Sequence, residues 1–116
     1  MSDITRIDQN ARRSRASVFG DLIFLAGQVA DSKSADIAQQ TREALAKVDD
    51  MPRAGTDKSR LLSVQVWLKT MDDFEAMNAV YDSWVVPGNA PTRACGKVEL
   101  ADPGYRIEVI AIAARK

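Results

Sequence analysis

The sequence predicts an α+β fold in which two helices lie on one face of a β-sheet, and three observations support this prediction. Apolar and polar side chains alternate in several short segments, as is typical of strands. Two longer segments carry apolar residues at helical spacing. The expected order is strand, hairpin, helix, strand, helix and two final strands, which is typical of the α+β class. The chain has 116 residues and fits one domain spanning residues 1–116.

The first three strands are expected at residues 4–8, 16–19 and 22–26. Gly20 and Asp21 separate the last two, and a two-residue loop with glycine first is a common hairpin turn. Gly27 follows at the end of a strand, where a glycine often permits a close backbone approach.

The first helix is expected to begin after Asp36, a favourable N-cap, with Gln39 at the third helical position. Pro52 and Gly55 are expected to end it. Its apolar residues at helical spacing are Ile37, Ala44, Leu45, Val48 and Met51.

A strand is expected next at residues 62–68, and a second helix is expected to begin near Asp72 and stop at Pro87 and Gly88. The alternating apolar residues of the strand are Leu62, Val64, Val66 and Leu68. The apolar stripe of the helix is formed by Phe74, Met77, Tyr81, Trp84 and Val85.

Residues 90–100 and 105–114 are expected to form two neighbouring strands joined by a tight turn at residues 102–104. Glu108 is a single carboxylate inside the apolar second strand, and burying a lone charge is costly. Arg93 on the preceding strand is a matching cation. The two side chains either form a small polar functional site or neutralise each other as a structural ion pair, with Arg106 as a second possible partner of Glu108.

Three further residues are candidates for the same site. Asn78 lies at the edge of the apolar stripe of the second helix, and its amide needs hydrogen-bond partners, either in a ligand or in a neighbouring loop. Cys95 shares the Arg93 face of its strand if alternation holds, and we interpret it as a small packed residue. Gly27 completes the set through its backbone.

Composition excludes several classes of function. The formal net charge is zero, which argues against a sequence-independent nucleic-acid surface, and we expect no nucleic-acid partner. The chain has one cysteine and no histidine, so disulfide frameworks, histidine metal sites and Ser-His-Asp triads are absent. No segment is long enough to span a membrane and no signal peptide is evident, so we expect a cytoplasmic location without a membrane partner.

The strands at residues 22–26 and 107–112 are apolar on both faces. Two helices can cover only one face of a sheet, so a monomer would expose a large apolar surface, which usually marks an interface. We therefore expect a closed homo-oligomer.

Several motifs together resemble the Rid family, the YjgF-type reactive-intermediate imine deaminases, over nearly the whole chain. They occur in the family's order and spacing at residues 24–28 (FLAGQ), 40–41 (QT), 64–68 (VQVWL), 71–81 (MDDFEAMNAVY), 90–95 (APTRAC) and 107–109 (IEV).

The resemblance implies a chorismate-mutase-like fold with a mixed sheet, assembled as a homotrimer with three clefts between subunits. It implies hydrolysis of 2-imino or enamine acids, such as 2-aminoacrylate, to 2-oxo acids and ammonia without a metal or organic cofactor. This activity is that of a 2-iminobutanoate/2-iminopropanoate deaminase and serves metabolite damage control.

Carried onto this chain, the resemblance makes Arg93 the clamp for the substrate carboxylate. Glu108 would hold the attacking water, with backbone groups around Cys95, and Asn78 would line the cleft. The chain departs from the family at Ala26, where many members have Ser or Thr before the Gly-Gln pair.

Two other functions remain open from the sequence. One is a non-catalytic trimer that binds small carboxylates or regulates a partner on the same scaffold. The other is a ribonuclease or translation inhibitor, which the neutral charge and the lack of histidine disfavour.

Overall fold

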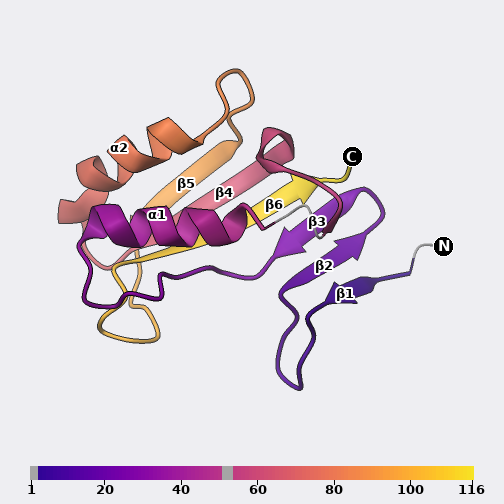
Figure 1. Ribbon diagram of the computed structural model, residues 1–116, viewed down its shortest axis with the longest axis horizontal. Coiled ribbons are helices and arrows are strands. Elements are labelled where there is room, and N and C mark those ends of the chain that lie inside the picture. The colour runs from indigo at the N-terminus through magenta and orange to yellow at the C-terminus, as the bar shows by residue number, and fades with distance from the viewer. Residues whose placement is uncertain (1–2, 51–53) are drawn as a thin grey trace.

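The computed structural model describes residues 3–50 and 54–116 and has two layers, a six-stranded sheet and two helices on one of its faces (Figure 1). The helices are α1 (Ile37–Val48) and α2 (Phe74–Trp84). The strands are β1 (Thr5–Ile7), β2 (Ala16–Phe19), β3 (Leu22–Leu25), β4 (Leu61–Leu68), β5 (Thr92–Lys97) and β6 (Ile107–Ala114). The predicted α+β class and the single helical layer are therefore confirmed.

The strands lie in the order β1-β2-β3-β6-β4-β5, and β4 pairs with β5 in parallel while the other pairs are antiparallel. This is a mixed sheet, as expected. The prediction that the last two strands are neighbours is wrong, because β4 lies between β5 and β6. A turn forms at residues 102–104, but the loop that contains it crosses β4 instead of closing a hairpin.

Local signals placed the first hairpin and the first helix correctly. Gly20 has a φ of 59° in the turn between β2 and β3, a left-handed conformation that glycine adopts without strain. At the start of α1, the Asp36 carboxylate accepts a hydrogen bond of 2.9 Å from the backbone N–H of Gln39. The expected helical position of Met51 and the stop at Pro52 lie outside the described residues.

The second helix begins at Phe74, close to the start near Asp72 that the sequence predicted. A 3₁₀ turn at Met71–Asp73 precedes α2, and the Thr70 hydroxyl accepts a hydrogen bond from the backbone N–H of Asp72. Asp72 therefore does not cap the helix. Asp73 occupies the N-cap position of α2 without a capping bond from its side chain, which leaves its carboxylate for another partner.

The hydrophobic core lies between the helices and the sheet. On β4, Val64, Val66 and Leu68 are fully buried, as the alternation predicted. The prediction for Leu62 is wrong: its side chain is 44% exposed, whereas Leu61 is buried. The pairing of β4 with β6 is irregular between Leu61 and Ser63, and this irregularity shifts the side-chain alternation by one residue.

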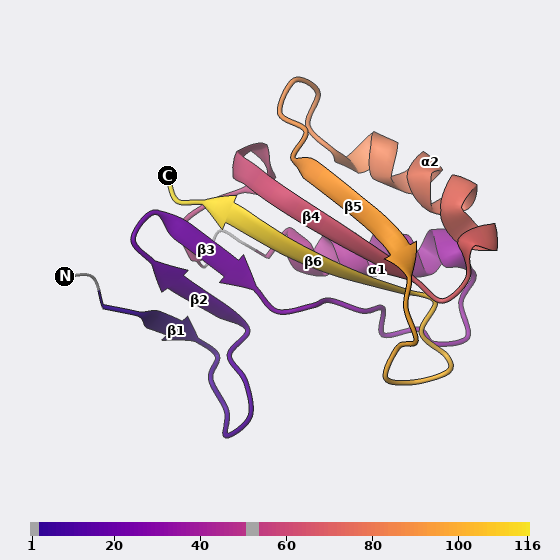
Figure 2. The same cartoon turned by 180° about the vertical axis from the view of Figure 1, so that it is seen from behind.

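The opposite face of the sheet carries no helix (Figure 2). Large apolar side chains are exposed on it. We call this the open face. Phe19, Leu22 and Phe24 are each between 39% and 50% exposed, and Leu22 and Phe24 are paired with residues of the outward-facing row of β6. A single subunit thus leaves the exposed apolar sheet surface that the sequence predicted.

Among the described residues, no helix is long and apolar enough to cross a lipid bilayer.

Candidate active site

Arg93 lies on β5, the edge strand of the sheet, and its side chain points to the helix side. Its register partner on β4 is Val64, which is buried beneath the helices. The guanidinium Nη1 donates a hydrogen bond of 2.8 Å to the side-chain oxygen of Asn78 and lies 3.9 Å from the sulfur of Met77. The guanidinium carbon lies 4.7 Å from the centre of the Tyr81 ring, so α2 holds the group against an aromatic face.

No carboxylate of the described residues pairs with Arg93. Within the described chain, the guanidinium forms its contacts through Nη1 and with the rings of Phe74 and Tyr81. The edge formed by Nε and Nη2 therefore has no partner among the described residues. This edge presents parallel N–H donors with the spacing of the two oxygens of a carboxylate. The site can therefore accept a small organic acid.

Glu108 lies on β6 with its side chain on the open face, as do Ile110 and Ile112. Within the described chain, no hydrogen bond or ion pair to its carboxylate is present. Desolvation by the surrounding protein raises the pKa of Glu108 above its usual value. An acid with a raised pKa accepts a proton more readily, which suits a general base.

Gly27 lies directly against the Glu108 carboxylate. A Cβ atom at position 27 would lie 2.0 Å from Oε2 of Glu108, so only glycine leaves room for this side chain. Two backbone hydrogen bonds between Gln28 and Val109, of 2.8 and 2.9 Å, lock the glycine segment onto β6. The close approach predicted at Gly27 is present, and its neighbour is the candidate base.

Arg93 and Glu108 lie on opposite faces of the sheet. Arg93 is paired with Val64 and Glu108 with Trp67, and residues 64 and 67 of one strand point to opposite sides. The structural ion pair considered for Arg93 and Glu108 is therefore wrong for a single subunit. A site that used both side chains would therefore need a second copy of the chain.

Cys95 lies on the Arg93 face of β5, as alternation predicted, and packs against the core. Burial raises the pKa of its thiol, while the nearby Arg93 charge acts in the opposite direction. The thiol is therefore the stable form, in agreement with its interpretation as a packed residue. The side-chain oxygen of Asn78, the remaining candidate, accepts the hydrogen bond from Arg93, so Asn78 orients the arginine.

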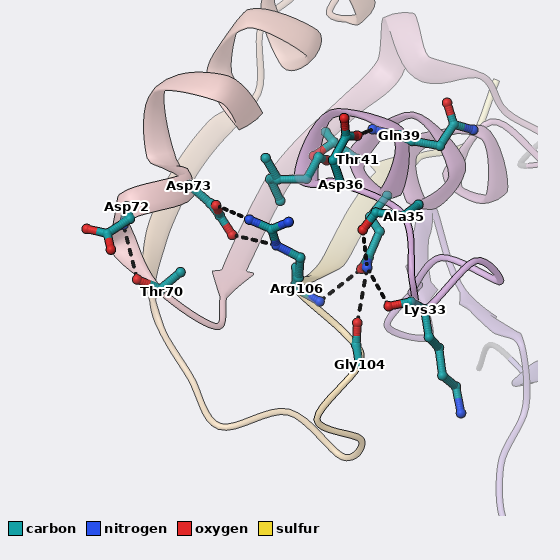
Figure 3. Close-up of polar contacts among 12 residues, drawn as sticks. Lys33, Ala35, Asp36, Gln39, Thr41, Thr70, Asp72, Asp73, Gly104 and Arg106 are labelled. Atoms are coloured by element: carbon teal, nitrogen blue, oxygen red, sulfur yellow. Dashed lines mark hydrogen bonds and ion pairs between the residues drawn. The ribbon is translucent and has the colours of Figure 1, made fainter.

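A buried polar network, which the sequence did not reveal, anchors the start of β6 (Figure 3). Arg106 donates two hydrogen bonds, of 2.7 and 3.1 Å, to the Asp73 carboxylate. The side chain of Gln40 is fully buried; its oxygen accepts from the backbone N–H of Arg106 and its nitrogen donates to the carbonyl of Gly104. Arg106 is thus paired with Asp73 instead of Glu108, and the network fixes the strand two residues before Glu108.

Among the described residues, no cluster of acidic and cysteine side chains has the arrangement of a metal site. The candidate residues themselves offer a guanidinium, a carboxylate and backbone groups. Because β5 is the edge of the sheet, some of the backbone N–H and C=O groups around Cys95 point outward without a strand partner in the subunit.

Known proteins are similar to this chain in sequence and in fold. The profile of the family described as Endoribonuclease L-PSP matches residues 4–115. A RutC family protein of Haemophilus ducreyi is 40% identical over 112 residues, which cover 96% of each chain. The 2-iminobutanoate/2-iminopropanoate deaminase of Escherichia coli is 30% identical over 105 residues, which cover 84% of this chain and 82% of that protein.

Solved structures agree with these sequence matches. A member of the YjgF protein family from Neisseria meningitidis superimposes with a TM-score of 0.95 at 36% identity, over 98% of this chain and 96% of that one. The matched profile spans nearly all of the chain, and relatives at 30% identity or more cover most of it. The chain therefore belongs to the YjgF/RutC/Rid family.

Proposed function

We propose that this protein hydrolyses reactive 2-imino and enamine acids to 2-oxo acids and ammonia in clefts between the subunits of a homotrimer. The observation that carries the proposal is the pair Arg93 and Glu108. They are a guanidinium and a carboxylate on opposite faces of one sheet, and neither has an ionic partner among residues 3–50 and 54–116. Unpaired charged groups on a rigid sheet are typical of a site that awaits a ligand.

Arg93 binds the carboxylate of the substrate in this proposal. Two parallel N–H donors fix both the position and the plane of a small acid, which a lysine cannot do. A 2-imino acid carries its carboxylate next to the electrophilic carbon, so this one contact also places the reacting C=N bond. Positioning is the main requirement, because the substrate is already reactive toward water.

Glu108 activates the water. Its carboxylate accepts a proton as the water oxygen forms a bond to the imine carbon and the π electrons of the C=N bond move to the nitrogen. Glu108 then gives this proton to the nitrogen, which completes the neutral tetrahedral carbinolamine. Glu108 next takes the hydroxyl proton and passes it to the nitrogen, so that the C–N bond breaks, ammonia leaves with the bonding electron pair, and the carbon–oxygen double bond of the 2-oxo acid forms. An enamine substrate first takes a proton on carbon and loses one from nitrogen to become the imine.

Assembly brings the two groups together in the proposed trimer. The open face is apolar and half exposed at Phe19, Leu22 and Phe24, so covering it with a second copy removes apolar surface from water. Glu108 lies on this same face, whereas Arg93 lies at the outer edge of the subunit on β5. A neighbour whose β5 edge meets the open face would place its Arg93 near Glu108.

Similarity to the deaminase of Escherichia coli supports the reaction class, and the RutC family relatives support the scaffold. Ala26 supplies no hydroxyl to the cleft beside Gly27, so Glu108 and backbone groups carry the water-binding role. The absence of this hydroxyl bears on substrate preference and leaves both the clamp and the base in place.

The test measures ammonia release from imines. An L-amino-acid oxidase generates these imines in situ by oxidising alanine or 2-aminobutyrate. Spontaneous hydrolysis is measured without the protein. The proposal expects the wild type to accelerate ammonia release and Arg93→Ala to lower kcat/KM by about a hundredfold. Equal rates for wild type and Arg93→Ala would contradict it. Calorimetric binding of 2-oxobutanoate without turnover would instead indicate the non-catalytic carboxylate-binding trimer.

A further inference from the structure

We infer that Tyr81 is a positioning residue for the Arg93 clamp and that the clamp binds its acid side-on, through the Nε and Nη2 edge of the guanidinium. The inference rests on the proposed function in taking Arg93 as the carboxylate-binding group. It adds the residue that orients the group and the edge that receives the ligand.

Three side chains of α2 surround one part of the guanidinium. The guanidinium carbon of Arg93 lies over the Tyr81 ring, 4.7 Å from its centre, and 6.0 Å from the centre of the Phe74 ring. Asn78 accepts a hydrogen bond from Nη1. The three residues are on successive turns of one helix, at positions 74, 78 and 81, so they form a continuous wall along β5.

These contacts leave one edge of the Arg93 guanidinium free among the described residues. The contact with the Tyr81 ring restrains the guanidinium from one side, and the hydrogen bond from Nη1 to Asn78 restrains its rotation. Nη1 is occupied, so Nε and Nη2 are the donors that remain for a ligand. Their two N–H bonds point in parallel, which is the side-on geometry of a bidentate carboxylate.

The aromatic ring of Tyr81, and not its hydroxyl, restrains the Arg93 guanidinium. Tyr81 is 6% exposed, and no hydrogen bond of its hydroxyl to another described residue is present. Burial is also the main cause that raises the pKa of Tyr81, so the phenol stays neutral and adds no charge to the site. A phenylalanine ring can therefore replace it in contact with Arg93.

The experiment compares wild type, Tyr81→Phe, Tyr81→Leu, Tyr81→Met and Asn78→Ala in the imine assay. Val48→Ala, a truncation in the same core on α1, controls for loss of packing alone. We expect Tyr81→Leu and Tyr81→Met to raise KM about fivefold with kcat nearly unchanged, because a cation–π contact is lost. Tyr81→Phe should retain the wild-type KM, and Val48→Ala should lower the unfolding temperature without changing KM.

Asn78→Ala tests the second restraint on the arginine. It should raise KM by a similar factor and leave the unfolding temperature close to that of wild type, because Asn78 is only partly buried. The inference is overturned if Tyr81→Phe behaves like Tyr81→Leu, or if the leucine and methionine variants lose stability while KM stays at the wild-type value.

A binding measurement separates this inference from the deaminase proposal. The dissociation constant of 2-oxobutanoate, measured by calorimetry, should rise in the same order across the Tyr81 variants. If wild type shows this binding but releases no ammonia from any imine, the deaminase proposal fails and the clamp inference stands. If wild type does not bind 2-oxobutanoate and the KM values show no dependence on Tyr81, the clamp inference fails.

Discussion

Arg93 and Glu108 lie on opposite faces of one sheet, with β4 between the strands that carry them. Neither side chain has an ionic partner in the described chain. Arg93 instead contacts Tyr81 and Asn78. The Glu108 carboxylate occupies the space beside Gly27 that a larger side chain would fill. This arrangement separates the two halves of the proposed site and makes assembly a condition of the proposed activity.

Replacing Glu108 by glutamine should stabilise the fold at neutral pH while it abolishes turnover. Because desolvation raises the folded-state pKa, Glu108 contributes stability below its unfolded pKa of about 4.3, and this contribution is lost as the pH rises through the folded pKa. Above that pKa the charged form is a cost that Glu108→Gln removes. Thermal unfolding of the two proteins at pH 7 and pH 4 measures this: the variant should melt higher at pH 7, and the difference should shrink at pH 4.

The same group sets the expected pH dependence of catalysis. Turnover by the wild type should fall as the pH decreases through the raised pKa of Glu108, because the neutral carboxyl cannot accept a proton from water. A Glu108→Gln variant that retained wild-type kcat, or melted below wild type at pH 7, would remove Glu108 from the proposed role.

Gly27→Ala should reduce activity with little loss of stability. The new methyl group would lie 2.0 Å from Oε2 of Glu108, so the carboxylate must turn away from its position. We expect kcat to fall by about a hundredfold, the scale of a displaced general base. Gly96→Ala is the matched control for the fold, since a methyl group there meets nothing within 4 Å, and it should keep the wild-type unfolding temperature. Wild-type kcat in Gly27→Ala would show that the glycine does not position Glu108.

Asp73→Ala should destabilise the protein by about 2 kcal/mol, because it removes a bidentate, partly buried ion pair with Arg106. Urea unfolding measures the change. Lys33→Ala breaks the exposed ion pair with Asp102 and serves as the control, with little expected effect. Equal effects of the two substitutions would mean that the Arg106 network does not anchor β6.

The limits of sequence-based prediction are visible in particular residues. The turn at Gly20 and the cap at Asp36 were predicted correctly because each depends on neighbours in the chain. The insertion of β4 between β5 and β6 was missed, since strand order depends on pairing between distant segments. The Asp73–Arg106 pair joins residues 33 positions apart and has no local signal.

The same distinction applies to the candidate site. Gly27 was predicted to permit a close approach, and the structure identifies the approaching group as Glu108. The sequence placed Arg93 and Glu108 on neighbouring strands, and this error in strand order suggested a direct ion pair. The faces of β5 and β6 could be related only once the register of both with β4 was known.

Phe24→Asp should convert the assembled protein to monomers. Phe24 is 41% exposed on the open face, and a charge there opposes burial against a second copy. Light scattering at micromolar concentration should give the mass of a trimer for wild type and of a single chain for the variant, with imine turnover lost. Met71→Asp changes an exposed apolar residue beside α2 and should remain assembled. A monomeric wild type would contradict the proposed cleft.

Mixed trimers of Arg93→Ala and Glu108→Gln subunits test the central claim most directly. Alone, the Arg93→Ala protein should keep about a hundredth of the wild-type kcat/KM, and the Glu108→Gln protein should show no turnover in the imine assay. In random trimers from equal amounts, about three quarters contain both subunit types, and each mixed ring has one cleft where an intact Arg93 meets an intact Glu108 of its neighbour. The account therefore predicts recovery of about a quarter of the wild-type activity after co-expression. No recovery in trimers shown to be mixed would contradict it.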